Sequence, residues 1–437
     1  MEIELPKDFL KRMEAMLGKE YDDFLKVYKK PYHRHGRFNS LKKKDFPLEV
    51  QDWILKRSPF CPNGAYFKEG IQPIHFASYR NGGFYMQEAS ASSVISLLKI
   101  QPGDYVLDMC AAPGSKTTQI GEYLQQEGLL VSNEYVSKRA MILLENIIRH
   151  GLQNALVLNC DTSLLAKEFP SGFDKIVVDA PCSGEGLFLK QEDSVQEWSL
   201  DHIAVCAKRQ ASILENAYTC LRKGGDLLYS TCTFAREENE DLIEAFFKKH
   251  ADMELVPITV PFGRPGFSPF ERTRRIFPMD GGTGQFMALL HKKGEETRHT
   301  WKTISTKKES FFQKEVNALL KKPYRYFHEF RGKLFAGNNP FLDNQSLKII
   351  RQMVYVGEIR TGRLILDHHF FMSSSLKKTC MIEINENQYR QYIHGETLSI
   401  SKPKGYYGLS FDGLVVGGCR SDGQQLKNLY PKVLRTR

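Results

Sequence analysis

Six short apolar runs, rich in β-branched residues, alternate with helical patterns through the middle of the chain. The runs are DYVLDM (104–109), GLLVSNEY (128–135), NALVLNC (154–160), DKIVVDA (174–180), DLLYSTC (226–232) and FMALLHK (286–292). Strands that alternate with helices form βαβ units, which build a mostly parallel sheet covered by helices on both faces. The middle of the chain is therefore predicted to be an α/β domain.

A length of 437 residues is too great for one ordinary hydrophobic core, so we expect two or three domains. Residues 1–75 begin with an amphipathic segment and continue with a basic and aromatic stretch, KKPYHRHGRFNSLKKK. The alternating runs occupy residues 76–293, and a polar, charged linker is predicted over 294–315. Strand and turn patterns in residues 316–437 favour a small α+β or β-barrel-like domain.

The net charge of +10 comes entirely from the C-terminal part. Residues 316–437 hold 19 Lys and Arg against 9 Asp and Glu; because the whole chain has 61 and 51, residues 1–315 hold 42 of each. A basic domain attached to a neutral one suits a polyanion such as nucleic acid, since neutralised phosphates release counterions. A solvated basic surface without a nucleic-acid partner explains the same charge equally well.

Membrane and metal-binding classes are disfavoured by the sequence. No run of 18 apolar residues is present, and the start MEIELPKDFLKRM lacks the apolar core of a signal peptide, so we expect a cytoplasmic protein without a membrane partner. The nine cysteines are an odd number without disulfide or metal-ligand spacing, which predicts reduced thiols and no metal.

The segment VLDMCAAPGSKTTQIGEYL (106–124) predicts a strand, a loop of small residues and a helix. This arrangement lets backbone amides approach a ligand at the start of the helix. A nucleoside triphosphate loop is disfavoured, because Met109 stands where its first glycine should be and Ser115 separates Gly114 from Lys116.

Four carboxylates follow the ends of successive predicted strands: Asp108, Glu134, Asp161 and Asp179. Ligands of such sheets bind beyond the carboxyl ends of the strands, so these side chains should converge on one crevice. Each of them alone could instead cap the next helix.

Cys182, in DAPCSGEG (179–186), and Cys232, in YSTCTF (229–234), also follow strand ends. A buried cysteine is usually a small apolar residue, and we interpret the other seven as non-catalytic. These two stand beside Pro, Ser, Thr and Gly, where the chain turns into the crevice. A thiolate is a soft nucleophile suited to an electron-poor pyrimidine ring, so the pair indicates a nucleophile and an assisting thiol.

The motifs CAAPGSK, DAPCSG and STCTF, in this order, resemble those of the Sun/Fmu family of RNA cytosine-5 methyltransferases. Further resemblances lie in GRFNSLK (36–42), GGFYMQEASA (82–91), REENE (236–240) and GTGQFMALL (282–290). The last stretch, from YIHGETLSI to LKNLYPKVLR, is similar to the RsmF branch, which modifies small-subunit ribosomal RNA and carries a PUA-like domain.

The resemblance implies a Rossmann-like class I methyltransferase domain at 76–293, an N-terminal RNA-binding region at 1–75 and a C-terminal PUA-like α+β domain that binds RNA at 316–437. It implies S-adenosylmethionine as cofactor and ribosomal RNA or the small ribosomal subunit as partner; we expect a monomer.

Site residues are implied in the same way. Cofactor binding falls to Cys110, Ala111, Ala112, Pro113, Gly114, Ser115, Lys116, Glu134 (ribose), Asp161 (adenine) and Asp179. Cys232 would attack carbon 6 of the cytosine, Cys182 would help resolve the adduct, and Asp179 would stabilise charge, tuned by Lys116. Two departures from the family are Glu134 for a common Asp and Ser115 for a common Gly; neither should prevent activity.

Two other functional classes fit the sequence less well. A DNA cytosine-5 methyltransferase uses the Pro-Cys thiol as nucleophile and carries an ENV-like tripeptide, which this chain lacks. A ribosome-assembly factor that keeps the fold without the chemistry is disfavoured because both cysteines and the acidic residues are present.

Overall fold

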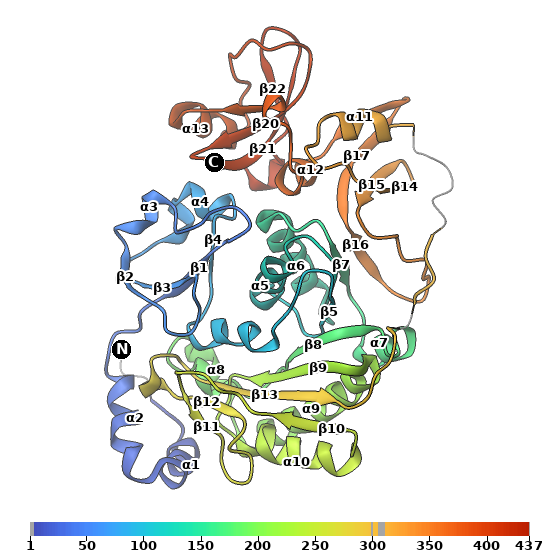
Figure 1. Cartoon of the computed structure of the whole chain (residues 1–437). Coiled ribbons are helices and arrows are strands. Elements are labelled where there is room, and N and C mark those ends of the chain that lie inside the picture. Colours follow the sequence, from blue (N-terminus) through green and yellow to red (C-terminus); the bar gives the residue numbers. More distant parts are fainter. Residues whose placement is uncertain (1–3, 299, 305–310, 437) are drawn as a thin grey trace.

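The computed structural model describes residues 4–298, 300–304 and 311–436. A ten-stranded sheet lies at the centre of the molecule, with smaller N-terminal and C-terminal units beside it (Figure 1). The path through the central sheet is β11-β12-β13-β9-β8-β5-β6-β7-β16, and β10 pairs with β13. The bounds of its first strands are β5 Tyr105–Asp108, β6 Leu129–Asn133, β7 Ala155–Leu158, β8 Phe173–Asp179 and β9 Leu221–Thr231.

Strands β5 to β9 of this sheet pair in parallel, as the βαβ pattern predicts. All six strands predicted from the apolar runs are present, the sixth being β13 (Gln285–Lys292), which runs antiparallel to β9. Three further strands extend the sheet beyond β9: β10 Met253–Val256, β11 Arg264–Pro265 and β12 Arg274–Ile276. The Rossmann-like class of the central domain is confirmed.

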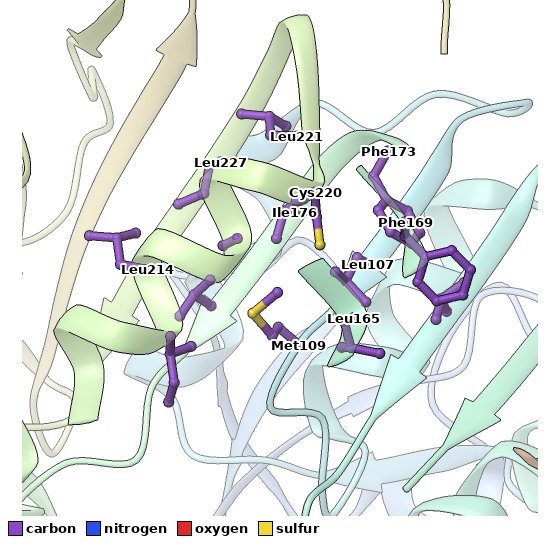
Figure 2. Packing of buried hydrophobic residues seen from close by; sticks show 14 of the residues in the cluster. Leu107, Met109, Leu165, Phe169, Phe173, Ile176, Leu214, Cys220, Leu221 and Leu227 are labelled. Carbon is purple, nitrogen blue, oxygen red and sulfur yellow. The ribbon is translucent and has the colours of Figure 1, made fainter. Parts of the chain in front are cut away.

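Helices cover both faces of the sheet (Figure 1). One face packs on α5 (Ser115–Leu124) and α6 (Ser137–His150), with Ile120 and Leu143 in the apolar contact. The other face packs on α7 (Thr162–Glu168), α9 (Leu200–Cys220) and α10 (Glu240–Lys249). Figure 2 shows this second layer, in which leucines of the strands meet those of the helices. Because both faces are buried, the strands are nearly continuous apolar runs.

The N-terminal unit contains two parts. Helices α1 (Lys7–Leu17) and α2 (Tyr21–Tyr28) form a hairpin whose buried face, including Phe9 and Phe24, packs against Phe188 and Phe234 of the central domain. A four-stranded sheet follows, with the order β2-β3-β1-β4. Its strands are β1 His35–Phe38, β2 Ile54–Arg57, β3 Gly64–Phe67 and β4 Phe84–Met86, accompanied by α3 Leu48–Gln51 and α4 Ala77–Arg80.

The C-terminal part holds two four-stranded sheets. The first has the order β14-β15-β17-β18, and the second has the order β19-β20-β21-β22. The strands are β14 Tyr326–Phe330, β15 Lys333–Gly337, β17 Val354–Arg360, β18 Arg363–Leu366, β19 Met381–Glu383, β20 Gly405–Phe411, β21 Leu414–Ser421 and β22 Leu426–Asn428; the helices are α11 Gln313–Ala318, α12 His368–Ser373 and α13 Glu386–His394. The mixed α+β character predicted for this part is confirmed.

One strand of the C-terminal part leaves its neighbours and joins the central sheet. Strand β16 (Ile349–Gln352) pairs antiparallel with β7, and Phe341 and Leu347 enter the same apolar cluster as the central helices. The predicted linker, 294–315, lies partly outside the described residues, and the domain boundaries stay a prediction.

Within the ranges that the structure describes, no helix is long and apolar enough to cross a membrane. The same residues contain no group of three or more His, Cys, Asp or Glu side chains placed to hold a metal ion.

Candidate active site

The carboxyl ends of the parallel strands carry the four predicted carboxylates. Asp108 and Asp179 are the last residues of β5 and β8, and Glu134 directly follows β6. Asp161 lies three residues beyond β7, where its side chain accepts a hydrogen bond from Ser163 N at 2.9 Å and caps α7. The capping role considered for each carboxylate is thus realised at Asp161, whose contact with adenine stays a prediction.

The loop of small residues after β5 is tied to the neighbouring elements by its backbone. Ala111 N donates to Asn133 O at 2.8 Å, and Asn146 Nδ2 donates to Pro113 O at 2.8 Å. Gly114 directly precedes α5 and has φ +110°, a left-handed conformation that favours glycine. The loop thereby presents the amino end of α5 beside the strand ends.

Glu134 is buried, with 4% of its surface exposed. Its Oε1 accepts from Val136 N at 2.8 Å, and its Oε2 lies 3.3 Å from Arg139 Nη1. A carboxylate has about four acceptor positions, so these two contacts leave capacity for hydroxyl donors.

Asp108 is wholly buried beside Glu134. Thr117 Oγ1 donates to Asp108 Oδ2 at 2.6 Å, while no hydrogen-bond partner for Oδ1 exists among the described residues. Burial raises the pKa of Asp108 to about 7. Oδ1 is thus a buried oxygen whose hydrogen-bonding capacity the described residues leave unused.

Lys116 and Asp179 link α5 to β8 through an ion pair. Lys116 Nζ donates to Asp179 Oδ2 at 2.6 Å, and Ser230 Oγ donates to Asp179 Oδ1 at 2.8 Å. Lys116 is nearly buried, whereas the Asp179 side chain keeps 33% exposure. Both carboxylate oxygens are therefore oriented, while part of the group stays exposed.

The two predicted cysteines lie together. Cys182 Sγ and Cys232 Sγ are 3.3 Å apart, although 50 residues separate them in the chain. The neighbouring Cys232 thiol, together with burial, raises the pKa of Cys182 well above its usual value. The proton is therefore held more firmly on Cys182 than on an ordinary cysteine.

Two buried acidic residues beside the thiols were not predicted as site residues. Glu185 and Glu238 are 2% and 0% exposed, and burial raises the pKa of both. They accept hydrogen bonds from the loops that carry Cys182 and Cys232. The signal was present in DAPCSGEG and REENE, but acidic residues in loops usually face solvent.

Arg37, in the basic stretch of the N-terminal unit, is also buried, with 0% exposure. It forms an ion pair with Glu122 of α5 and donates to Ser115 O at 3.0 Å and to Thr118 Oγ1 at 2.5 Å. This arginine therefore supports α5, and its guanidinium is not available at the surface.

Three family models match separate parts of the chain. Residues 95–291 match the model described as 16S rRNA methyltransferase RsmB/F, and residues 5–89 match the N-terminal domain of 16S rRNA methyltransferase RsmF. Residues 381–436 match the PUA domain of methyltransferase RsmF. The PUA-like fold expected at the C-terminus is thereby confirmed.

Whole-protein comparisons agree with these matches. Ribosomal RNA small subunit methyltransferase F of Aeromonas salmonicida is 29% identical over an alignment of 462 positions, which covers 98% of this chain and 97% of the relative. The protein of the same name from Vibrio parahaemolyticus is 38% identical, but the match covers 54% of this chain and about half, 52%, of that relative.

Among solved structures, a methyltransferase homolog from Pyrococcus horikoshii is 27% identical with a TM-score of 0.58, and the match covers 66% of this chain and 96% of that one. The central sheet, the paired motifs and the three domain matches lead to one assignment. The chain belongs to the RsmB/F family of 16S rRNA methyltransferases.

Proposed function

We propose that the protein methylates carbon 5 of cytosine in RNA, with S-adenosylmethionine as methyl donor. The RNA that we propose as its substrate is small-subunit ribosomal RNA. The observation that carries the proposal is the pair of thiols, 3.3 Å apart, beside the oriented carboxylate of Asp179. Cys232 follows Ser230 by two residues and Cys182 follows Asp179 by three, so all of these groups face one region.

Residues at the carboxyl ends of the strands support binding of the cofactor. Glu134 supplies a buried carboxylate for the two ribose hydroxyls, and Asp108 Oδ1 is an acceptor without a partner in the described chain. The loop from Cys110 to Gly114 offers backbone groups without large side chains. The bound cofactor would supply an electrophilic methyl group.

Cys232 is proposed as the nucleophile that adds to carbon 6 of the cytosine. Addition at carbon 6 makes carbon 5 nucleophilic, which an aromatic pyrimidine is not. Asp179 would hydrogen-bond ring nitrogen 3 and stabilise the charge that develops, while Lys116 and Ser230 keep its carboxylate oriented.

Cys182 is proposed to act after methylation, when the proton on carbon 5 must leave and the bond to Cys232 must break. Its position 3.3 Å from the attacking sulfur places it beside the adduct. To take up that proton, Cys182 must be a thiolate when the adduct is resolved, and its raised pKa then makes it a stronger base than an ordinary cysteine thiolate.

RNA is supported as the substrate by the names of the relatives and by the basic C-terminal part of the chain. The target base must leave its stack to reach the partly buried thiols, which favours single-stranded or loosened RNA.

Transfer of tritiated methyl groups to small-subunit RNA, compared with duplex DNA, tests the proposal. We expect incorporation into RNA alone, and digestion should yield 5-methylcytidine. Incorporation into DNA would indicate the DNA enzyme class, and no incorporation into either would favour a non-catalytic assembly factor. Bisulfite mapping of rRNA from a strain that lacks the protein then identifies the position.

A further inference from the structure

Two carboxylates join the loops that carry Cys182 and Cys232, and each accepts hydrogen bonds from the opposite loop. Glu185, three residues after Cys182, accepts from Thr233 Oγ1 at 2.9 Å and from Phe234 N at 2.8 Å. Glu238, six residues after Cys232, accepts from Ser183 N at 3.0 Å and from the Ser183 hydroxyl.

The backbone adds a third connection. Gly186 N donates to Cys232 O at 2.8 Å, and a Cβ at Gly186 would lie 2.8 Å from the same oxygen. The carbonyl of Cys232 is thus held directly by the loop of Cys182, at a distance that only glycine allows.

These contacts do not serve charge neutralisation. Within the described residues neither carboxylate forms an ion pair, and the other donors are Trp198 Nε1 for Glu185, at 3.0 Å, and Gln210 Nε2 for Glu238, at 2.7 Å. Two buried carboxylates supplied only with neutral donors are costly to keep, unless their hydrogen bonds hold a geometry that the site needs.

We propose that Glu185 and Glu238 are positioning residues that hold the two thiols in register for attack and release. The proposal rests on the function proposed above and extends it to two buried residues outside the set of site residues named there. Each carboxylate fixes the backbone beside the cysteine of the opposite loop, so loss of one should let the sulfur atoms separate without disturbing Glu134 or Asp108.

The two sites differ in how they tolerate glutamine. At Glu185 both oxygens face an N–H donor, from Trp198 on one side and Phe234 on the other, so an amide NH2 meets a donor in either orientation. At Glu238 one oxygen faces only the Ser183 hydroxyl, which can rotate and accept. E185Q should therefore disturb the loops more than E238Q.

The test measures how fast the two thiols crosslink when the full-length protein is treated with diamide. The thiols lose two hydrogens and form a disulfide while diamide is reduced to the hydrazine, and mass spectrometry follows the Cys182–Cys232 peptide. We expect E185Q to slow crosslinking, and single-turnover methylation of RNA, about tenfold or more, with a smaller loss for E238Q. The KM for the cofactor should stay unchanged.

Glu237→Gln is the matched control, because Glu237 lies next to Glu238 but pairs with Arg12 instead. It should crosslink and methylate at the wild-type rate. If E185Q does not fold, as judged by thermal unfolding, the comparison of E238A with E238Q replaces it, and E238A should be the slower.

Wild-type crosslinking in folded E185Q, or in E238A, would overturn the positioning role. Crosslinking requires neither RNA nor cofactor, so it tests the positioning role independently of the methylation reaction. If the protein methylates no substrate but its variants show the predicted order of crosslinking rates, the proposed function is wrong and the positioning role stands.

Discussion

Cys182 Sγ lies 3.3 Å from Cys232 Sγ, so either thiol is close enough to take part in chemistry at the same base. If Cys232 attacks carbon 6, Cys232→Ser should abolish turnover and any covalent protein–RNA complex. If Cys182 acts only after methylation, Cys182→Ala should accumulate a covalent complex that survives denaturing gels.

The gel separates three cases. A trapped complex with Cys232→Ser but not with Cys182→Ala would reverse the assignment and place the nucleophile in the Pro-Cys motif. Two fully active variants, each less stable by roughly 1 kcal/mol, would mean that both cysteines are ordinary core residues.

The architecture of the central domain was predictable because its strands are buried on both faces. Strand β8, for example, is recognisable from DKIVVDA, and the chain direction then places Asp179 and Cys182 at its carboxyl end. The same reasoning predicts from the sequence that Cys182 and Cys232, which follow the ends of β8 and β9, lie close together.

The positions of strand β16 and of Arg37 could not be predicted from the local sequence. Strand β16 belongs to the central sheet only because its partner β7 offers a free edge, and nothing in IIRQ identifies that edge. Arg37 stands in a basic stretch of the sequence, and only tertiary packing places it against Glu122. Long-range partners of charged residues are not encoded in hydrophobic periodicity.

Glu134→Ala tests the cofactor crevice. Loss of a charged acceptor should weaken S-adenosylmethionine by about 1.5–3 kcal/mol, measured by calorimetry. Asp161→Ala tests a different role, the capping of α7. Because the cap is lost, the substitution should lower the unfolding free energy by about 0.5–2 kcal/mol. Equal cofactor affinity in Glu134→Ala and wild type would place the cofactor elsewhere.

Arg37→Met tests the support of α5. The change leaves the buried carboxylate of Glu122 without its cation, which should lower the unfolding free energy by about 3–5 kcal/mol in urea titrations. The double variant with Glu122→Met should regain a large part of this loss. A cost below 1 kcal/mol for Arg37→Met would show that the ion pair is not needed.

Asp108 predicts a pH dependence. Its pKa is raised in the folded chain to about 7, against about 3.9 unfolded, so the folded state binds more protons between these values. The contribution of Asp108 to the unfolding free energy should therefore fall as pH rises from 4 to 7. Asp108→Asn lacks this titration, so its stability relative to wild type should increase by about 1–4 kcal/mol between pH 5 and pH 8 in urea titrations. A constant difference would contradict the shift.

The last prediction assigns RNA affinity to the C-terminal basic surface. Removal of the whole part near Ser310, a position outside the described residues, would also remove β16 from the central sheet, so charge substitutions are the cleaner test. Lys402, Lys404 and Arg420 are exposed around β20 and β21. Their joint replacement by Gln should raise the KM for RNA and reduce the slope of log affinity against log salt by up to about 2, since each lost phosphate contact removes about 0.7 for single strands.

Cofactor affinity should not change in this variant, because the substitutions lie outside the crevice of Glu134 and Asp108. The matched control replaces three exposed lysines of the central domain, Lys167, Lys248 and Lys249, and should leave the salt slope as it is. Equal slopes for both triple variants would mean that the C-terminal charge excess is an ordinary solvated surface, and RNA contacts would then have to come from the N-terminal unit and the crevice.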